Sequence, residues 1–134
     1  MTQSRRQVLV VEDDPEINEL VGAYAQIAGF GYEAALNGFT ALSKAFAEAP
    51  VLILLDVMLP DMDGFEVCRR LKRDHLTCTI PVVMLTALDR EEYRRRGQEC
   101  GAAAFLGKPF DPDALIEMIR KMASDGANLQ PSQT

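Results

Sequence analysis

Residues 51–56 read VLILLD, an unbroken apolar run that ends in a carboxylate. Two further runs of the same kind are VLVV at 8–11 and VVML at 82–85. Short runs rich in branched apolar residues are typical of strands buried on both faces, as in a parallel sheet covered by helices. The first run therefore predicts a central strand that carries Asp56 to the end of a buried sheet.

Weaker strands and five helical patterns surround these runs. Residues 31–35 and 103–106 are the weaker strand candidates, and they are expected nearer the sheet edges. Helices are predicted between the strands, and the last begins at Asp111-Pro112, a capping residue followed by a first-turn proline. Five strands that alternate with five helices predict an α/β domain with a parallel sheet and right-handed crossovers.

Two of the predicted helices differ in the apolar surface that they offer. The first opens at Asp14-Pro15 and ends at Gly29. Its expected buried face consists of Ile17, Leu20, Val21, Tyr24, Ile27 and Ala28. The helix at 90–100 is expected to pack weakly, and elements that move in switching are drawn from the less stable parts of a fold. The small apolar face of this helix consists of Tyr93, Gly97 and Cys100.

Length and composition describe one ordinary domain. The chain has 134 residues, of which 48% are hydrophobic and 25% are charged. A domain of this size can bury enough apolar surface to fold without disulfides or metal ions. We assign residues 1–123 to the domain. Residues 124–134 are polar and lack periodicity, which predicts a disordered tail or the start of a linker.

Charge and cysteine content exclude several classes of protein. The net charge of −6 offers no general attraction to nucleic acid or to an anionic membrane. No apolar stretch approaches the roughly 20 residues that cross a bilayer, and the polar start of the chain predicts no signal peptide. The scattered cysteines argue against a disulfide framework or a zinc site and indicate a reducing cytoplasm. These cysteines are Cys68, Cys78 and Cys100.

Polar side chains follow four of the predicted strands at the carboxyl ends, where ligands bind in open parallel α/β sheets. Asp13 and Asp14 follow the first strand, Asp56 ends the third, and Thr86 and Lys108 follow the fourth and fifth. Carboxylates gathered without His or Cys favour a hard cation, and Mg²⁺ suits an incomplete cage that leaves room for a phosphate oxygen. Asp13 and Asp14 are equally well explained as caps of the first helix, and Asp14 can serve in both ways.

Asp56 is the candidate for covalent chemistry. A carboxylate at the end of a buried strand is costly without a metal ion or a cationic partner, and aspartate is a known covalent phosphoryl carrier. Transfer to Asp56 requires neutralisation of the phosphoryl oxygens, which Mg²⁺ and the Lys108 ammonium group can supply. The Thr86 hydroxyl can donate a hydrogen bond to the same oxygens. The rim of the sheet is therefore predicted to accept a phosphoryl group.

Four motifs, in order along the chain, resemble the receiver domain of bacterial two-component response regulators. They are VLVVEDDP at 8–15, LLDVMLPDMDG at 54–64, PVVMLTA at 81–87 and GAAAFLGKPF at 101–110. The intervals between Asp56, Thr86 and Lys108 match as well. The resemblance covers nearly the whole chain. It implies a single flavodoxin-like domain of five βα units, with strand order 2-1-3-4-5 and helices on both faces of the sheet.

The resemblance also implies a role for each residue at the rim. Asp56 would accept the phosphoryl group, and Thr86 and Lys108 would contact it. Phe105 would be the aromatic switch residue, turning inward together with Thr86 on activation. The implied cofactor is Mg²⁺, for which Mn²⁺ could substitute. Its implied ligands are Asp13, Asp14, Asp56 and the backbone carbonyl of Met58.

The implied partners belong to a phosphorelay. The phosphoryl donor would be a sensor histidine kinase or a histidine phosphotransfer protein, and the target would be an output protein or domain outside this chain. The protein would be a cytoplasmic switch that catalyses only its own phosphorylation and dephosphorylation, and phosphorylation could lead to a homodimer. No direct contact with nucleic acid or membrane is expected.

Two other classes fit less well, and one alternative stays open. A small Mg²⁺-dependent phosphohydrolase would resemble a D-x-D pattern in which the second acid protonates the leaving group, whereas Met58 stands at that position here. A flavodoxin-type FMN carrier needs a Ser/Thr/Gly-rich phosphate loop after the first strand, where Glu12, Asp13 and Asp14 would repel the phosphate. The open alternative is a receiver-like interaction module that works without phosphorylation.

Overall fold

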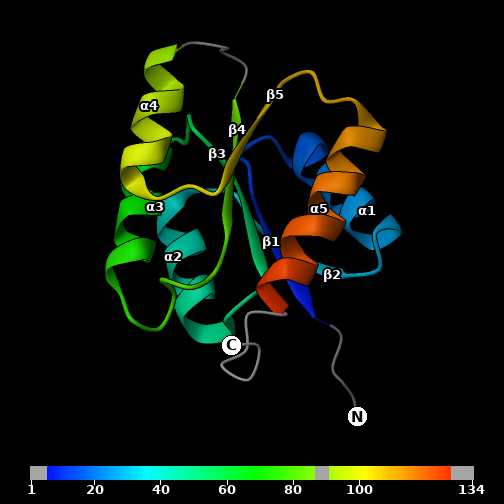
Figure 1. Ribbon diagram of the computed structural model, residues 1–134, viewed down its shortest axis with the longest axis horizontal. Coiled ribbons are helices and arrows are strands. Elements are labelled where there is room, and N and C mark those ends of the chain that lie inside the picture. The colour runs from blue at the N-terminus through cyan, green and yellow to red at the C-terminus, as the bar shows by residue number, and fades with distance from the viewer. Residues whose placement is uncertain (1–5, 87–90, 128–134) are drawn as a thin grey trace.

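The computed structural model describes residues 6–86 and 91–127, in which five strands and five helices alternate (Figure 1). The strands are β1 (Gln7–Val11), β2 (Gly31–Ala35), β3 (Leu52–Asp56), β4 (Val82–Thr86) and β5 (Ala104–Gly107). The helices are α1 (Pro15–Ile27), α2 (Gly38–Glu48), α3 (Gly64–Arg73), α4 (Glu91–Cys100) and α5 (Pro112–Ala127). The α/β prediction is confirmed, and the predicted boundaries lie close to the observed ones everywhere except at the end of α5.

The five strands form one parallel sheet in the order β2-β1-β3-β4-β5, as the resemblance implied. All residues of β3 and β4 are buried. The weaker candidates β2 and β5 are the edge strands, because an edge strand needs less apolar sequence than one with neighbours on both sides. Asp56 therefore lies at the carboxyl end of the central strand.

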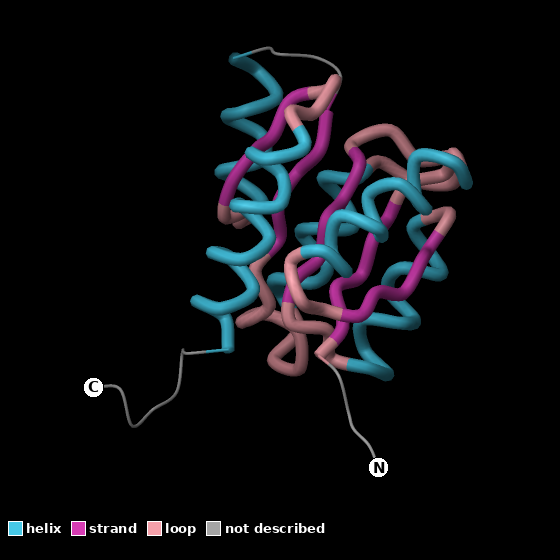
Figure 2. Tube along the Cα trace, turned by 90° about the vertical axis from the view of Figure 1, so that its right-hand side faces the viewer, coloured by secondary structure: helices cyan, strands magenta, loops and turns pink. Residues whose placement is uncertain are grey.

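Helices cover both faces of the sheet, as Figures 1 and 2 show. Helices α1 and α5 pack on one face, against side chains such as Val10 and Leu54, and α2, α3 and α4 pack on the other, against side chains such as Leu9 and Leu55. Successive residues of a strand point to opposite faces, so an unbroken apolar strand supplies both cores.

The predicted buried face of α1 is partly wrong. Val21 is buried as expected, but Leu20 and Ile27 are exposed to 49% and 60%. The cause is Asn18, a buried polar residue whose side-chain amide donates hydrogen bonds to the backbone carbonyls of Val10, Glu12 and Ala35. This contact turns α1 so that Asn18 faces the sheet and Leu20 lies at the surface.

The last helix runs further than the sequence pattern predicted. Residues 124–127, which we had placed in a polar tail, continue α5 as far as Ala127. The remainder of that predicted tail, residues 128–134, lies outside the described residues. None of the helices in the described part of the chain has the length and apolar content that a membrane span requires.

Candidate phosphoryl-transfer site

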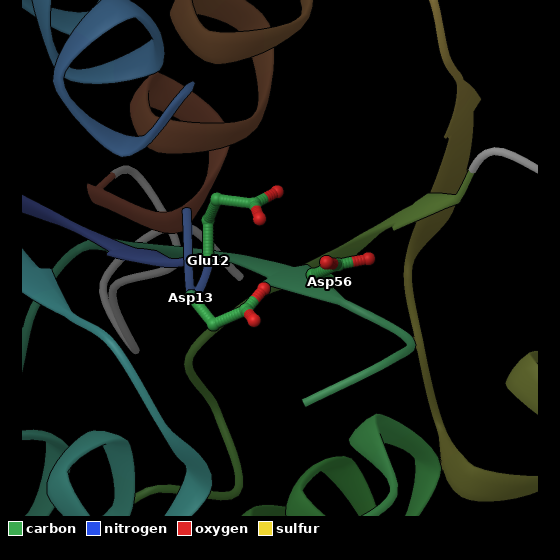
Figure 3. Close-up of side chains that lie close together, drawn as sticks. All are labelled: Glu12, Asp13 and Asp56. Atoms are coloured by element: carbon green, nitrogen blue, oxygen red, sulfur yellow. The ribbon is translucent and has the colours of Figure 1, made fainter. Parts of the chain in front are cut away.

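Three carboxylates meet where β1 and β3 end (Figure 3). Glu12 and Asp13 directly follow β1, and Asp56 is the last residue of β3. One carboxylate oxygen from each lies within 4.8 Å of the other two. Glu12 and Asp56 are buried, with exposures of 2% and 7%, while Asp13 is exposed to solvent. Two of the three carboxylates are therefore buried inside the domain, and the third is exposed to solvent.

Lys108 supplies the positive charge of the site. Its ammonium nitrogen lies 2.7 Å from Oε1 of Glu12 and 3.5 Å from Oδ2 of Asp56. The backbone N–H of Lys108 donates a hydrogen bond to the carbonyl of Thr86, which holds the residue after β5 beside the end of β4. The peptide bond between Lys108 and Pro109 is cis. The Lys108 ammonium group thus lies beside the Asp56 carboxylate, and its contact with a phosphoryl group stays a prediction.

Burial controls the charges of these groups. It raises the pKa of Asp56, although Lys108 opposes the shift and the charge of Asp13 adds to it. Burial likewise raises the pKa of Glu12 against the opposing hydrogen bond from Lys108. Burial alone would lower the pKa of Lys108, but its hydrogen bond to Glu12 and the charge of Asp56 outweigh it, and that pKa is raised. Two buried carboxylates thus share one ammonium group, an imbalance that a bound cation would relieve.

The acidic group that the fold brings together differs from the predicted ligand set at one position. Of the described residues, the acidic group takes in Glu12 and leaves out Asp14. Asp14 is the N-cap of α1, and its Oδ1 accepts hydrogen bonds from the backbone N–H groups of Glu16 and Ile17. Glu12 is held in the site because Oε2 accepts from the backbone N–H of Asp14 while Oε1 accepts from Lys108.

The sequence contained a signal for this difference. Asp14-Pro15 already predicts a helix cap, and a carboxylate that caps a helix points at backbone N–H groups rather than into a neighbouring site. Glu12 directly follows a buried apolar run, as Asp56 does, and this position predicts a residue at the carboxyl ends of the strands.

Thr86 and Phe105 lie on the side of the site that faces α4. Thr86 ends β4, is 6% exposed, and pairs in the sheet register with Gly107 of β5. Phe105 is half-buried, and its ring occupies the space that a side chain on Gly97 of α4 would need. The two predicted switch residues therefore connect the rim to α4, while their movement stays a prediction.

Comparison with known proteins identifies the family. The family model described as the response regulator receiver domain matches residues 8–120. The chain belongs to this family. Receiver domains are signalling domains of two-component systems, so the predicted family, fold and phosphorelay function are confirmed.

Two curated relatives show how far the similarity extends. RpaA of Synechocystis, named as a DNA-binding dual master transcriptional regulator, is 40% identical over 116 residues, which cover 87% of this chain and 48% of RpaA. The response regulator PleD of Caulobacter vibrioides is 44% identical over 116 residues, which cover 87% of this chain and 26% of PleD. The chain thus spans about half of one relative and about a quarter of the other.

A solved structure matches the whole receiver domain. The chemotaxis protein CheY4 of Vibrio cholerae superposes with a TM-score of 0.83 at 32% identity, covering 89% of this chain and 99% of CheY4. The receiver fold therefore accounts for nearly all the described residues.

The loop after β3 places backbone groups close to the Asp56 carboxylate. The backbone N–H of Met58 lies 3.5 Å from Oδ1 of Asp56, and the Met58 side chain is 68% exposed. The backbone N–H of Gly64 donates to the carbonyl of Val57 at 2.7 Å. A side chain on Gly64 would collide with the carbonyl of Asp56, so this glycine permits α3 to begin directly against the site.

The donor set fits the Mg²⁺ that receiver domains bind through acidic residues. All three side chains in the group are carboxylates, which are the hard oxygen ligands that Mg²⁺ prefers. Mg²⁺ usually keeps several waters and takes only a few protein ligands, and exposed Asp13 leaves one side of the group open to water. The residues present therefore match the requirements of this cation.

Proposed function

We propose that this receiver domain accepts a phosphoryl group on Asp56 from a phosphohistidine in a Mg²⁺-dependent reaction. The position of Asp56 carries the proposal. It is a buried carboxylate at the end of the central strand, with two further carboxylates within 4.8 Å and the Lys108 ammonium group 3.5 Å away. A nucleophile beside one ammonium group and a cluster of carboxylates that can hold a cation suits phosphoryl transfer, because the reaction needs little more than positioning and charge neutralisation.

The proposed step forms one bond and breaks one. A carboxylate oxygen of Asp56 attacks phosphorus while the bond from phosphorus to the donor's imidazole nitrogen breaks, and that nitrogen keeps the electron pair. An acyl phosphate on Asp56 results, and attack of water on it returns the carboxylate and releases phosphate. Both reactions take place on the chain's own Asp56, so the domain would catalyse only its own modification.

The neighbouring side chains would stabilise the negative charge of the transferred group. Lys108 would exchange part of its contact with Glu12 for a phosphoryl oxygen, and Thr86 would donate its hydroxyl hydrogen to another. Glu12, Asp13, Asp56 and the backbone carbonyl of Met58 would hold the metal ion. When bound, Mg²⁺, or Mn²⁺ in its place, supplies further neutralisation of the phosphoryl oxygens.

We further propose that the phosphorylated site acts on α4. Movement of Thr86 towards the phosphoryl group would free the space beside it for Phe105, whose ring now packs on Gly97. A displaced ring would change how α4 sits on the sheet. The output partner would then read the surface formed by α4, β5 and α5, and a homodimer could form through the same surface.

An apolar groove beside Lys108 is proposed as the docking place of the phosphoryl donor. The groove has a volume of about 440 Å³. Its lining consists of Ile17, Leu20, Tyr24, Lys108, Pro109 and Phe110. Leu20 is 49% exposed there, although the helix pattern predicted its burial. An amphipathic helix of a sensor histidine kinase or phosphotransfer protein would cover this surface and bring its histidine next to the site.

We also propose where the output lies, whether the domain binds nucleic acid, and in which compartment it works. Because RpaA is about twice as long as the matched region, the output is assigned to a domain or protein outside the receiver domain. The acidic net charge supports no direct role in binding nucleic acid. Three free cysteines are compatible with a reducing cytoplasm, where we place this activity.

The test is phosphorylation with acetyl phosphate, a small donor that needs no kinase. The protein is incubated with acetyl phosphate and Mg²⁺, and its intact mass is compared with that of the Asp56→Asn variant. We expect the wild type to gain one phosphoryl group only when Mg²⁺ is present, and the variant to gain none. If neither protein gains mass and beryllofluoride does not bind, the domain is an interaction module that works without phosphorylation.

A second pair of variants tests whether Glu12 or Asp14 is the metal ligand. Glu12→Gln removes a proposed ligand, whereas Asp14→Asn keeps a side chain that caps a helix well. We expect Mg²⁺ to raise the unfolding temperature of Asp14→Asn as it does that of the wild type, and to have a weaker effect on Glu12→Gln. Equal loss in both variants would restore Asp14 as a ligand.

A further inference from the structure

Cys68 and Cys100 lie 32 residues apart in the sequence and meet between α3 and α4. The Sγ atom of Cys68 lies 3.4 Å from the carbonyl oxygen of Cys100 and donates its proton to it. The Sγ atom of Cys100 lies 3.1 Å from the carbonyl oxygen of Gly97. Both side chains are buried, with exposures of 0% and 5%. The scattered positions of the cysteines argue against a disulfide framework, but the fold brings these two residues into contact.

The two thiols also interact with each other. The nearby Cys100 thiol raises the pKa of Cys68, and burial raises it further. The nearby Cys68 thiol lowers the pKa of Cys100 to about 7. Cys100 is therefore the thiol of the pair that loses its proton first, and the thiolate is the form of cysteine that reacts with oxidants.

Cys100 also occupies the better position for reaction with a small molecule. It is the last residue of α4 and is followed by Gly101, whose φ of 98° ends the helix in the left-handed region. Helix ends open more readily than helix centres, and α4 has little apolar surface to hold it closed. Cys68, by contrast, lies in the middle of α3 and is fully buried.

The pair lies away from the phosphoryl-transfer site. Residues next to Cys100 pair with the beginning of β4, where the N–H of Ala103 donates to the carbonyl of Val82. Asp56 ends the neighbouring strand β3, at the carboxyl ends of the strands and therefore at the opposite end of β4 from Val82. The side chains that hold the phosphoryl group are therefore independent of the two thiols.

We propose that Cys68 and Cys100 form a redox-sensitive dithiol, which a hydroperoxide oxidises to a disulfide that links α3 to α4. The Cys100 sulfur attacks one peroxide oxygen, the O–O bond breaks, and the leaving oxygen takes up a proton. The Cys68 sulfur then attacks the Cys100 sulfenic acid, the S–O bond breaks, and hydroxide leaves with the Cys68 proton as water. The two thiols lose two electrons, and the peroxide gains them.

The consequence of this bond falls on α4. Figure 1 shows α3 and α4 side by side on the same face of the sheet. A covalent link at the end of α4 removes the opening of that end as an independent motion. Since α4 is the helix that phosphorylation is proposed to displace, the oxidised domain would hold α4 in the position of the resting domain.

The experiment uses the Cys78→Ser variant, because Cys78 is exposed and would react by itself. The folded variant is treated with an equimolar amount of hydrogen peroxide, digested without reduction, and examined by mass spectrometry. We expect the Cys68 and Cys100 peptides to be joined with the loss of two hydrogen atoms, and dithiothreitol to separate them. Further replacement of Cys68 with Ala is expected to abolish the link and to leave Cys100 as a sulfenic acid that dimedone traps.

Two results would overturn the proposal. One is recovery of Cys68 and Cys100 as free thiols at peroxide doses that fully oxidise Cys78 of the wild type. The other is a disulfide that forms but leaves amide exchange in α4 as fast as in the reduced protein. Both readouts use variants with an intact α3–α4 interface, so they stand even if the Cys68→Ala variant fails to fold.

Discussion

Helices α4 and α5 flank the edge strand β5, one on each face of the sheet, and they are held in different ways (Figure 1). Helix α5 buries three apolar side chains completely: Leu115, Ile119 and Ala123. Of the α4 residues whose burial is described, only Gly97 and Cys100 are buried, and the aromatic residue Tyr93 is half-buried. Because the free energy of burial grows with apolar area, α5 belongs to the stable core, and α4 can be displaced at lower cost.

Polar and aromatic contacts replace the missing apolar area in α4. Arg96 forms an ion pair of 3.0 Å with Asp63, and its guanidinium group lies 4.3 Å from the centre of the Phe65 ring. Tyr93 meets the same ring edge to face at 5.7 Å. Asp63 caps α3 and Phe65 lies in its first turn, immediately after the loop that follows Asp56. Helix α4 is thus attached to the segment that follows Asp56.

The largest expected effect is in α5. Ile119→Ala removes a fully buried side chain, and we expect it to lower the free energy of unfolding by about 2–5 kcal/mol. Tyr93→Ala in α4 removes a larger but half-buried side chain, and we expect a smaller loss. Urea denaturation of both variants measures the two values. Equal losses would break the distinction between the helices.

Amide hydrogen exchange should separate the same two helices in the unmodified protein. The free energy of local opening in a protein ranges from near zero to the free energy of global unfolding. We expect this opening free energy to be about 3 kcal/mol lower in α4 than in α5, so that amides in α4 exchange about 100-fold faster. The measurement is native-state exchange read by NMR at individual amides. Similar protection in the middle of both helices would show that α4 is not a separate unit of stability.

Gly97→Ala tests the contact between α4 and the proposed switch residue. Alanine favours a helix, but its methyl group would collide with the Phe105 ring, so we expect a net loss of about 1–3 kcal/mol. In a Phe105→Ala background the collision is absent, and the same change should stabilise by up to about 1 kcal/mol. The sign change in this double-mutant cycle is the result to look for. If Gly97→Ala lowered the stability equally in both backgrounds, a collision with the Phe105 ring would not be the cause.

The smallest expected effect is that of Arg96→Ala. It removes a half-exposed ion pair and a contact with an aromatic face, together worth about 1 kcal/mol or less. Part of this loss should disappear at high salt, which screens the ion pair and leaves the apolar packing of α5 unchanged. The exposed neighbour Arg95 provides the control, and Arg95→Ala should have no measurable effect on stability.

Local sequence patterns were sufficient for most of the fold. The apolar runs of β1, β3 and β4 predict central strands because a residue buried on both sides of a sheet must be apolar whatever its partner is. Asp111-Pro112 predicts the start of α5 because a cap acts on its own helix. The end of α5 was missed because residues 124–127 are polar, and the helix continues there through its own hydrogen bonds.

The sequence by itself determined the family, the order of the strands through that family, and the presence of Asp13, Asp56, Thr86 and Lys108 at one rim. These follow from motifs and from the rule that parallel strands end at the same edge of a sheet. Only the tertiary structure decided that Glu12 rather than Asp14 joins Asp56, because the backbone after β1 turns one carboxylate into the site and the next onto the helix.

The tertiary structure alone also decided which distant residues meet. Asn18 displaces Leu20 to the surface by donating hydrogen bonds to strand ends, which no helical period shows. Cys68 and Cys100 touch because α3 and α4 pack against the same face of the sheet. Side-chain periodicity records which face of an element is apolar, whereas contacts between elements depend on how those faces are rotated and shifted when they pack.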